Sequence, residues 1–343
     1  MKILFLLTIA LSLLFGGCSD LKEYIIDLNL PPHDRYIEII KDFKEPILAM
    51  HDHFMENLDP FLKTEISKHY SIIKTNYGEY MSEIEGMAKL LNLSKESLFT
   101  LNLYFETIIA CTSIIGREEN GDLLHMRNFD FGDQEFFSKI TYSGIYLHGS
   151  SYYKCIGTAG FVGQKTCMRP YQFSISANAR FITWDPRDNL KYLEKGYMPS
   201  IWEIRRSVEQ SDDFKQIKQY WLHALVVFPG YVIITGINQQ RNSENNDGCV
   251  ITRASETVDD VVCLSDDPEM WYIVKTNSDR DEESECPRYQ TAVKALENLG
   301  QRNLNLQSFE NVVNIPPVKH EGTIYRSSMC PANGYFQTFL YDF

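Results

Sequence analysis

Asn120 and Gly121 lie between two runs of strand-forming residues, "CTSIIGR" before them and "LLHMRNF" after them. An Asn-Gly pair between such runs is the strongest short-range signal for a β-hairpin, because both residues of a two-residue turn must accept a positive φ. With Asn120 and Gly121 as the turn, the register pairs Cys111 with Asp130, and paired residues share one face of the hairpin. The sequence therefore predicts that one cysteine and one carboxylate lie opposite each other.

Arg127 has the wrong spacing for the same face. Successive side chains of a strand point to opposite faces, so in this register Arg127 pairs with Ile114 and points away from Cys111. For Arg127 also to reach Cys111, the second strand must bulge or end near Asn128 and Phe129. A small buried cysteine beside a partly exposed Arg–Asp ion pair would explain the same residues without any chemistry.

The N-terminus has the pattern of a secretory signal peptide over residues 1–18. A single lysine precedes an apolar run from Ile3 to Phe15, and small residues follow it. The run is shorter than the ~20 residues that a membrane span needs. An uncleaved anchor and a lipoprotein signal ending at Cys18 are the alternatives. Secretion would permit disulfides.

Charge and cysteine usage exclude several classes of protein. The chain of 343 residues carries 46 acidic and 33 basic residues and has no Lys/Arg-rich run, so no nucleic-acid partner is expected. If Cys18 and Cys111 are set aside, six of the eight cysteines remain, and 15 pairings stay open. There is no C-x-x-C pair, and the His51/His53 pair has no third ligand nearby. We therefore expect no metal and no cofactor.

Two regions differ in character. Residues 19–110 are predicted to be mainly helical, with Ser94 as the N-cap of a helix that buries Leu98 and Leu101. Asn92 begins an N-x-S sequon just before that cap, so it is the expected glycosylation site. After Cys111, runs rich in Val, Ile, Thr and aromatics alternate with helical stretches at 197–222 and 288–312, which predicts an α+β fold.

The segment "CTSIIGREENGDLLHMRNFDFG" resembles the start of the catalytic chain in the N-acylethanolamine acid amidase and acid ceramidase family, N-terminal-nucleophile cysteine hydrolases related to choloylglycine hydrolases. "IDLNLPP", "LNLSKESLFTLNLYFE", "GCVITR", "WYIVKTNSDRD" and "TIYRSSM" follow the family's order along nearly all of the chain after the leader. "RYQTAVKALENLGQRNLNLQ" is closer to the amidase than to the ceramidase. The resemblance implies an αββα sandwich with a helical N-terminal α subunit.

The resemblance also implies self-cleavage between Ala110 and Cys111. Residues 19–110 would become the α subunit and residues 111–343 the catalytic β subunit of a heterodimer made from one precursor. Cleavage would turn an internal cysteine into a terminal one, whose own α-amine can serve as the base. The enzyme would work in the lysosome or outside the cell. The site residues that the resemblance implies are Cys111 as nucleophile, Asp130 orienting the new amine, Arg127 beside the thiolate, Asn277 as an oxyanion donor, Arg288, and Asn178 as a second oxyanion donor.

One position departs from the family pattern. Where the family commonly reads Asn-Glu-Arg or Asp-Glu-Arg, this chain reads Asn178-Ala179-Arg180, so a carboxylate is missing. For Asn178 a structural role at a turn is an alternative. The expected activity is hydrolysis of fatty-acid amides, N-acylethanolamines first, at a lipid or membrane surface that the enzyme touches peripherally. Ceramide hydrolysis and an inactive lipid-binding homologue are the alternatives.

Overall fold

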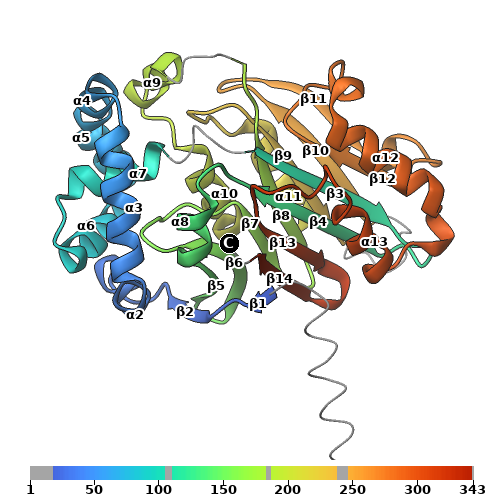
Figure 1. The fold of residues 1–343 in the computed structure, drawn as a ribbon, viewed down its shortest axis with the longest axis horizontal. Coiled ribbons are helices and arrows are strands. Elements are labelled where there is room, and N and C mark those ends of the chain that lie inside the picture. The colour runs from blue at the N-terminus through green and yellow to red at the C-terminus, as the bar shows by residue number, and fades with distance from the viewer. Residues whose placement is uncertain (1–17, 105–109, 183–186, 238–245, 342–343) are drawn as a thin grey trace, which may run out of the picture.

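The structure, a computed structural model, describes residues 18–104, 110–182, 187–237 and 246–341. The signal peptide expected at residues 1–18 therefore lies, except for Cys18, outside the described residues. Two β-sheets face each other with helices on their outer sides, and further helices of the N-terminal segment (residues 19–110) lie at one end, at the left of Figure 1. The C-terminal segment (residues 111–343) contributes most strands of both sheets.

Each sheet contains strands from both segments. The first sheet has six strands, in the order β1 (Cys18–Asp20), β14 (Tyr335–Tyr341), β13 (Thr323–Cys330), β4 (Leu123–Asp130), β3 (Ala110–Arg117) and β12 (Tyr272–Lys275). The second has eight, in the order β11 (Val258–Cys263), β10 (Asp247–Arg253), β9 (Gly230–Gly236), β8 (Phe173–Ala179), β7 (Thr166–Arg169), β6 (Ser151–Thr158), β5 (Thr141–His148) and β2 (Glu23–Asp27). All neighbours are antiparallel except β2 and β5.

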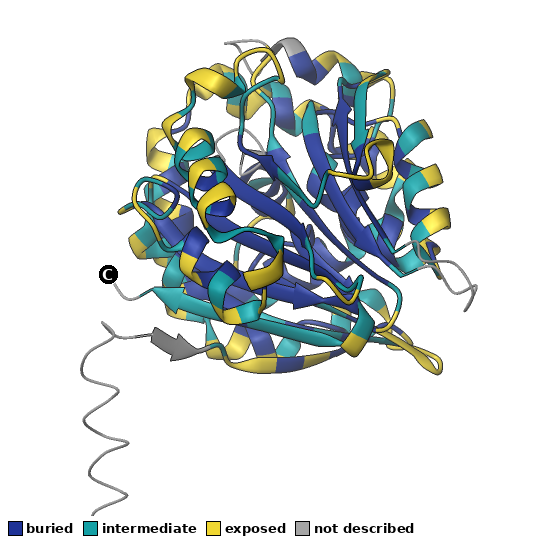
Figure 2. Cartoon of the chain, turned by 90° about the vertical axis from the view of Figure 1, so that its right-hand side faces the viewer, coloured by how far each residue is buried: buried dark blue, intermediate teal, exposed yellow. Residues whose placement is uncertain are grey.

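Helices close the sandwich on both sides. The outer face of the first sheet packs against α12 (Pro287–Leu299) and α13 (Leu306–Val313), and the second sheet packs against α10 (Ser200–Gln210) and α11 (Phe214–His223). Most strands are buried, although β11 and β14 are mainly half-buried, whereas the helices alternate buried and exposed residues (Figure 2). This is the αββα sandwich that the resemblance implied, and both helical stretches expected after Cys111 are confirmed.

The β3–β4 hairpin forms, but the predicted register is wrong by one residue. Cys111 pairs with Phe129, and Ala110 pairs with Asp130. The loop has three residues rather than two, because only Gly121 takes a positive φ, at 87°, while Asn120 does not. Asn120 instead accepts the Asp122 N–H on its side-chain oxygen at 2.9 Å, which stabilises a turn that ends in a left-handed glycine.

The shift changes which side chains meet. Cys111 and Arg127 now share the face between the two sheets, and Asp130 lies on the opposite face, toward the outer helices. No bulge in the β3–β4 ladder is needed to bring Arg127 to Cys111. The irregularity lies one strand further on, in β13, where the pairing to β4 skips Ile324 between Thr323 and Tyr325.

The N-terminal segment is mainly helical, as expected, but it starts with two short strands that the sequence did not predict. Its helices are α2 (Ile37–Asp42), α3 (Lys44–Asn57), α4 (Pro60–Lys68), α5 (Tyr70–Asn76), α6 (Gly78–Leu91) and α7 (Lys95–Tyr104). Ser94 caps α7, accepting the Ser97 N–H at 3.0 Å. The sequon residue Asn92 is exposed and takes a φ of 60° at the end of α6.

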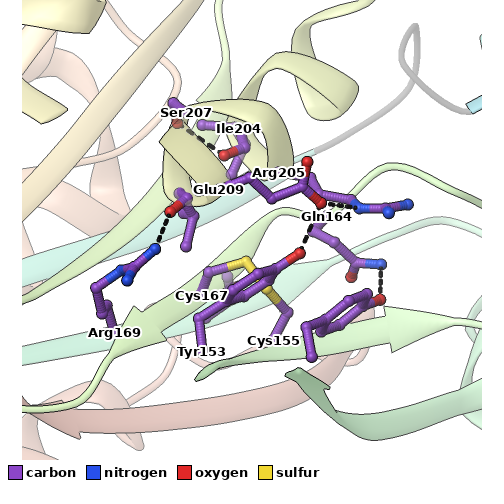
Figure 3. Close-up of a disulfide and its surroundings, with 12 residues drawn as sticks. Tyr153, Cys155, Gln164, Cys167, Arg169, Ile204, Arg205, Ser207 and Glu209 are labelled. Atoms are coloured by element: carbon purple, nitrogen blue, oxygen red, sulfur yellow. Dashed lines mark hydrogen bonds and ion pairs between the residues drawn. A yellow bond between two sulfur atoms is a disulfide. The ribbon is translucent and has the colours of Figure 1, made fainter. Parts of the chain in front are cut away.

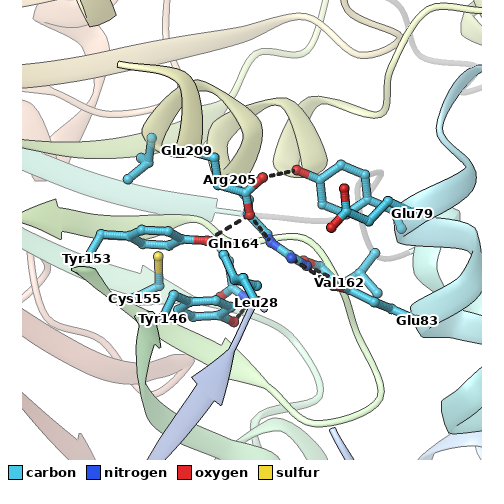
Figure 4. Close-up of polar contacts among 12 residues, drawn as sticks. Leu28, Glu79, Glu83, Tyr146, Tyr153, Cys155, Val162, Gln164, Arg205 and Glu209 are labelled. Atoms are coloured by element: carbon cyan, nitrogen blue, oxygen red, sulfur yellow. Dashed lines mark hydrogen bonds and ion pairs between the residues drawn. The ribbon is translucent and has the colours of Figure 1, made fainter. Parts of the chain in front are cut away.

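A buried ion network joins the two segments (Figure 4). The carboxylate of Glu83, from α6, is fully buried and accepts from Arg35 Nη1 and from Arg205 Nη2, both at 2.8 Å. Arg205 belongs to α10 and also donates to Glu209 at 2.8 Å. Glu209 in turn accepts from the Tyr153 hydroxyl at 2.8 Å. Two arginines and two glutamates thus neutralise one another where N-terminal helix α6 meets C-terminal helix α10.

Two disulfides resolve part of the pairing that the sequence left open. Cys155 bonds to Cys167 across neighbouring strands β6 and β7 (Figure 3), and Cys249 bonds to Cys263 across β10 and β11. Both lie within the C-terminal segment. Along the described ranges, none of the helices combines the length and apolar character needed to cross a bilayer.

Candidate active site

Cys111 lies in β3 between the two sheets and is completely buried. Arg127, in β4, donates from Nη2 to Cys111 Sγ at 2.8 Å. The guanidinium is itself fully buried and lies 5.7 Å from the centre of the Phe129 ring. A buried cation against sulfur is the setting in which a thiolate is stabilised.

Asn178, at the end of β8 in the facing sheet, holds Arg127 in place. Its Oδ1 accepts from Arg127 Nη1 at 3.1 Å and from the Ser113 hydroxyl at 2.9 Å. Its Nδ2 donates to the backbone carbonyls of Lys275 and Thr276, at 3.0 and 3.1 Å. Both amide hydrogens of Asn178 are thus engaged while the chain is uncut. Asn178 contacts Arg127 through its Oδ1 alone.

Strand β12 brings Asn277 to Cys111. In the β3–β12 ladder Lys275 pairs with Ser113, so two residues further along the antiparallel register Asn277 falls beside Cys111. Its Oδ1 accepts the Cys111 N–H at 2.9 Å, and its Nδ2 donates to the Ala179 carbonyl at 2.8 Å. The Cys111 N–H is a donor and the Ala179 carbonyl an acceptor, which fixes the orientation of the amide.

Arg288 lies in the first turn of α12 and contacts the nucleophile's own backbone. Its Nη1 donates to the Cys111 carbonyl at 2.7 Å, and its Nη2 donates to Asn277 Oδ1 at 2.9 Å. The same Nη1 lies 3.4 Å from Asp130 Oδ2. Arg288 therefore connects the Cys111 backbone, the Asn277 amide and the Asp130 carboxylate.

Asp130 is completely buried on the helix-facing side of the first sheet. Its Oδ1 accepts from the Thr323 hydroxyl at 2.7 Å, because β13 pairs Thr323 directly with Asp130. Its Oδ2 lies 3.3 Å from His320 Nε2. The expectation that Asp130 lies directly opposite Cys111 is wrong, since the pairing partner of Asp130 is Ala110. The Cys111 N–H instead donates to Asn277 Oδ1.

The charges around Cys111 act on its pKa in opposite directions. Burial raises the pKa of the Cys111 thiol above its ordinary value; the Arg127 guanidinium lowers it, and the Asp130 carboxylate raises it. Arg288 lowers it further. The net direction is upward, so the thiol form is favoured while Cys111 is enclosed in the continuous chain.

An apolar cavity opens beside Asn178 and Ala179. Its walls come mainly from β8, β9, α10 and the loop after α11: Lys165, Ala177, Asn178, Ala179, Ser200, Ile201, Trp221, Val226, Phe228, Pro229, Gly230, Val232 and Arg253. The lining includes no carboxylate, in part because Ala179 stands where the family pattern has a glutamate. Asn178, which positions Arg127, thus forms part of the cavity wall.

In the part of the chain that the structure describes, one cluster has the composition of a metal site. Asp247, Cys249 and Cys263 lie close together, but the two cysteines are joined to each other as a disulfide. Their thiolates are therefore not available as ligands.

All six site residues predicted from the sequence fall into one connected set around Cys111, although their chemical roles remain predictions. His320 was missed. It lies in the turn before β13, without any local signal, and only the pairing of β13 with β4 shows that it faces Asp130. Lys165, also missed, is buried and lies 4.8 Å from the centre of the Phe129 ring.

A family model described as the beta subunit of N-acylethanolamine-hydrolyzing acid amidase matches residues 19–69. In that description the name beta subunit falls on the segment ahead of Cys111, which was named the α subunit above. N-acylethanolamine-hydrolyzing acid amidase of Caenorhabditis elegans is 28% identical over 332 residues, covering 92% of this chain and 91% of that protein.

Acid ceramidase of Homo sapiens is 26% identical over 345 residues, covering 93% of this chain and 86% of that protein. Among solved structures, the N-acylethanolamine-hydrolyzing acid amidase orthologue of Caenorhabditis elegans superposes with a TM-score of 0.60 at 26% identity. It covers 67% of this chain and 99% of that one. Over nearly its whole length the chain is therefore similar to N-acylethanolamine acid amidases and acid ceramidases, and these relatives support a hydrolase that acts on amide bonds.

Proposed function

We propose that the chain is a cysteine amidase that hydrolyses fatty-acid amides, with N-acylethanolamines as the preferred substrates. The observation that carries the proposal is the pair of contacts on Cys111. Arg127 donates to its sulfur at 2.8 Å, and Asn277 accepts its backbone N–H at 2.9 Å. A sulfur and an adjacent nitrogen held by separate side chains suit a nucleophile that uses its own amine as the base.

The chain would first cleave itself between Ala110 and Cys111. The Cys111 thiol loses its proton, and its sulfur attacks the Ala110 carbonyl carbon. The peptide C–N bond breaks, the nitrogen takes up a proton, and the N-terminal segment is left as a thioester on sulfur. Water then hydrolyses the thioester, which gives the Ala110 carboxylate and a Cys111 with a free thiol and a free α-amine.

Amide hydrolysis would repeat these steps on a substrate. The free amine, whose ordinary pKa is about 7.7–8.0, accepts the thiol proton while sulfur attacks the acyl carbonyl. The substrate's amine leaves with that proton, and water releases the fatty acid from the thioester. Arg127 would stabilise the thiolate, with Asn178 fixing the guanidinium. Asn277 is the candidate oxyanion donor, since its Nδ2 could turn from the Ala179 carbonyl to the developing charge.

The apolar cavity beside Asn178 and Ala179 is the candidate site for the acyl chain, because its lining is dominated by aliphatic and aromatic side chains. Phe181 and Ile182, just beyond Ala179, are 59% and 52% exposed. They are candidates for peripheral contact with a lipid surface. With the leader peptide expected from the sequence and a sequon at the exposed Asn92, the protein would mature along the secretory pathway and act in the lysosome or outside the cell.

Cys111→Ala tests the proposal. The expected result is that the variant stays a single chain on a denaturing gel and hydrolyses neither palmitoylethanolamide nor ceramide, while the wild type is cut at Cys111. N-terminal sequencing of the larger fragment must begin at Cys111. Full activity of an uncut chain, or of the alanine variant, would overturn the proposal. Turnover of ceramide faster than palmitoylethanolamide would leave the chemistry standing and reassign the substrate.

A further inference from the structure

His320 is held on both sides of its ring. Its Nε2 lies 3.3 Å from Asp130 Oδ2, and its Nδ1 accepts the Gly322 N–H at 3.0 Å. Because a backbone N–H already points at Nδ1, the neutral ring carries its hydrogen on Nε2. That hydrogen faces the Asp130 carboxylate.

The ring connects a buried group with solvent. Asp130 is completely buried, whereas the His320 side chain is 37% exposed. The other groups on the Asp130 carboxylate are the Thr323 hydroxyl and Arg288 Nη1. The charged groups that act on His320 are Asp130 from β4, Arg288 from α12 and its chain neighbour Glu321.

We propose that His320 is a positioning residue of the amidase site, which holds the Asp130 carboxylate from the solvent side and thereby sets the position of Arg288. The inference rests on the proposed function. Arg288 reaches the Cys111 carbonyl at 2.7 Å and Asn277 Oδ1 at 2.9 Å. A change in charge or position at His320 is therefore passed through Asp130 and Arg288 to the groups that hold the nucleophile's backbone.

Protonation changes what the ring can do. In the imidazolium form Nε2–H still donates to Asp130, now with a full positive charge behind it. Nδ1 then carries a hydrogen as well and must give up the Gly322 N–H. The hydrogen bond to Asp130 raises the pKa of His320, against the opposing effects of burial and Arg288. Acidification thus tightens the His320–Asp130 pair and loosens the turn before β13.

The first test does not need activity. In the Cys111→Ala chain, with histidine rings isotopically labelled, NMR titration should give His320 a pKa above the ordinary histidine value of about 6.5. Replacing Asp130 by Asn in the same chain should lower the pKa of His320 by about half a unit or more. A His320 titration that is unchanged by Asp130→Asn overturns the inference. If the wild type has no amidase activity, the proposed function is overturned, but this NMR measurement remains valid.

The second test measures the kinetics of amide hydrolysis. His320→Gln keeps an N–H donor but does not titrate, and His320→Ala removes the donor. Over a range of about pH 4 to 8, both should lose one ionisation from the pH profile of kcat/KM that the wild type and the His148→Gln control retain. His320→Ala should lower kcat about ten-fold with KM unchanged within about two-fold, and His320→Gln should fall between it and the wild type. If the pH profiles of kcat/KM for both variants superimpose on that of the wild type, the inference is wrong.

Discussion

Arg127 and Cys111 lie on the same face of one hairpin, two positions apart in its register, and the guanidinium donates to the sulfur at 2.8 Å. A three-residue loop, rather than a two-residue one, produces this arrangement, because it shifts the pairing by one residue. The regular alternation of the strands therefore brings the cation to the thiol. The same shift moves Asp130 to the outer face, where it pairs with Arg288.

Replacing Arg127 by Met should slow both self-cleavage and amide hydrolysis. Loss of a hydrogen bond to a charged group costs about 1.5–3 kcal/mol, which corresponds to about a 10- to 150-fold lower rate. Since Arg127 lowers the pKa of the Cys111 thiol, the variant's thiol pKa should rise, and its alkylation should require higher pH. The pH dependence of iodoacetamide labelling of the cleaved enzyme measures this. Arg302→Met, at a 90% exposed side chain, is the control, and equal labelling profiles for both variants would contradict the role of Arg127.

Asn178→Ala separates a positioning role from a binding role. The variant loses the acceptor that fixes Arg127 Nη1, and it leaves the carbonyls of Lys275 and Thr276 without their donor. Leaving buried polar groups unpaired costs about 1–3 kcal/mol each, so the unfolding midpoint in urea should fall. We expect kcat to drop more than KM rises. A variant with unchanged kcat and a strongly raised KM would make Asn178 a substrate-binding residue instead.

Glu83 should hold the two segments together after cleavage. Removing one partner of a buried pair costs about 3–5 kcal/mol, because a charge is left buried alone. Glu83→Gln leaves both Arg35 and Arg205 without their shared carboxylate. The cleaved variant should separate into two fragments during gel filtration, whereas the wild type elutes as one complex.

Glu79 provides a matched control for that experiment. It contacts the same Arg35, but its side chain is 60% exposed, and exposed ion pairs contribute about 0–1 kcal/mol. Glu79→Gln should therefore elute as a complex. Equal dissociation of the two variants would show that the ion network is not what joins the segments.

Local patterns in the sequence predicted several elements correctly. The hairpin, the Ser94 cap and the helical stretches at 197–222 and 288–312 follow from residues close in the chain. The register failed because an Asn-Gly pair fits both a two-residue turn and the last two positions of a three-residue loop. Sequence pattern alone does not separate these, since each satisfies Gly121 equally well.

Local sequence patterns did not predict the contacts between strands that lie far apart in the sequence. His320 contacts Asp130 only because β13 pairs with β4, and the paired residues Thr323 and Asp130 lie 193 positions apart in the sequence. Glu83 and Arg205 are likewise brought together by packing of α6 against the C-terminal segment. The six site residues could be named in advance because the resemblance supplied them together. Their partners and orientations come from the fold.

His125 gives the chain a stability that falls in acid. It is fully buried between the hydroxyls of Ser174 and Ser176, each at 2.9 Å. Burial, with a contribution from Arg127, lowers the pKa of His125 to about 3. Below about pH 6.5 the unfolded chain binds a proton at this residue and the folded chain does not. The free energy of unfolding should therefore drop by on the order of 2 kcal/mol between about pH 7 and 5 through His125 alone.

His320 acts in the opposite sense, since its pKa is raised. Its contribution to stability is fully present below about pH 6.5 and is lost as the pH rises through its folded pKa. Urea unfolding at about pH 7 and pH 5 separates the effect of His125 from that of His320. His125→Gln should lose stability near neutral pH but show a smaller drop on acidification than the wild type, whereas His320→Gln should lose more stability in acid than at neutral pH. If the wild type and His125→Gln lose equal stability on acidification, His125 is not a source of the acid sensitivity.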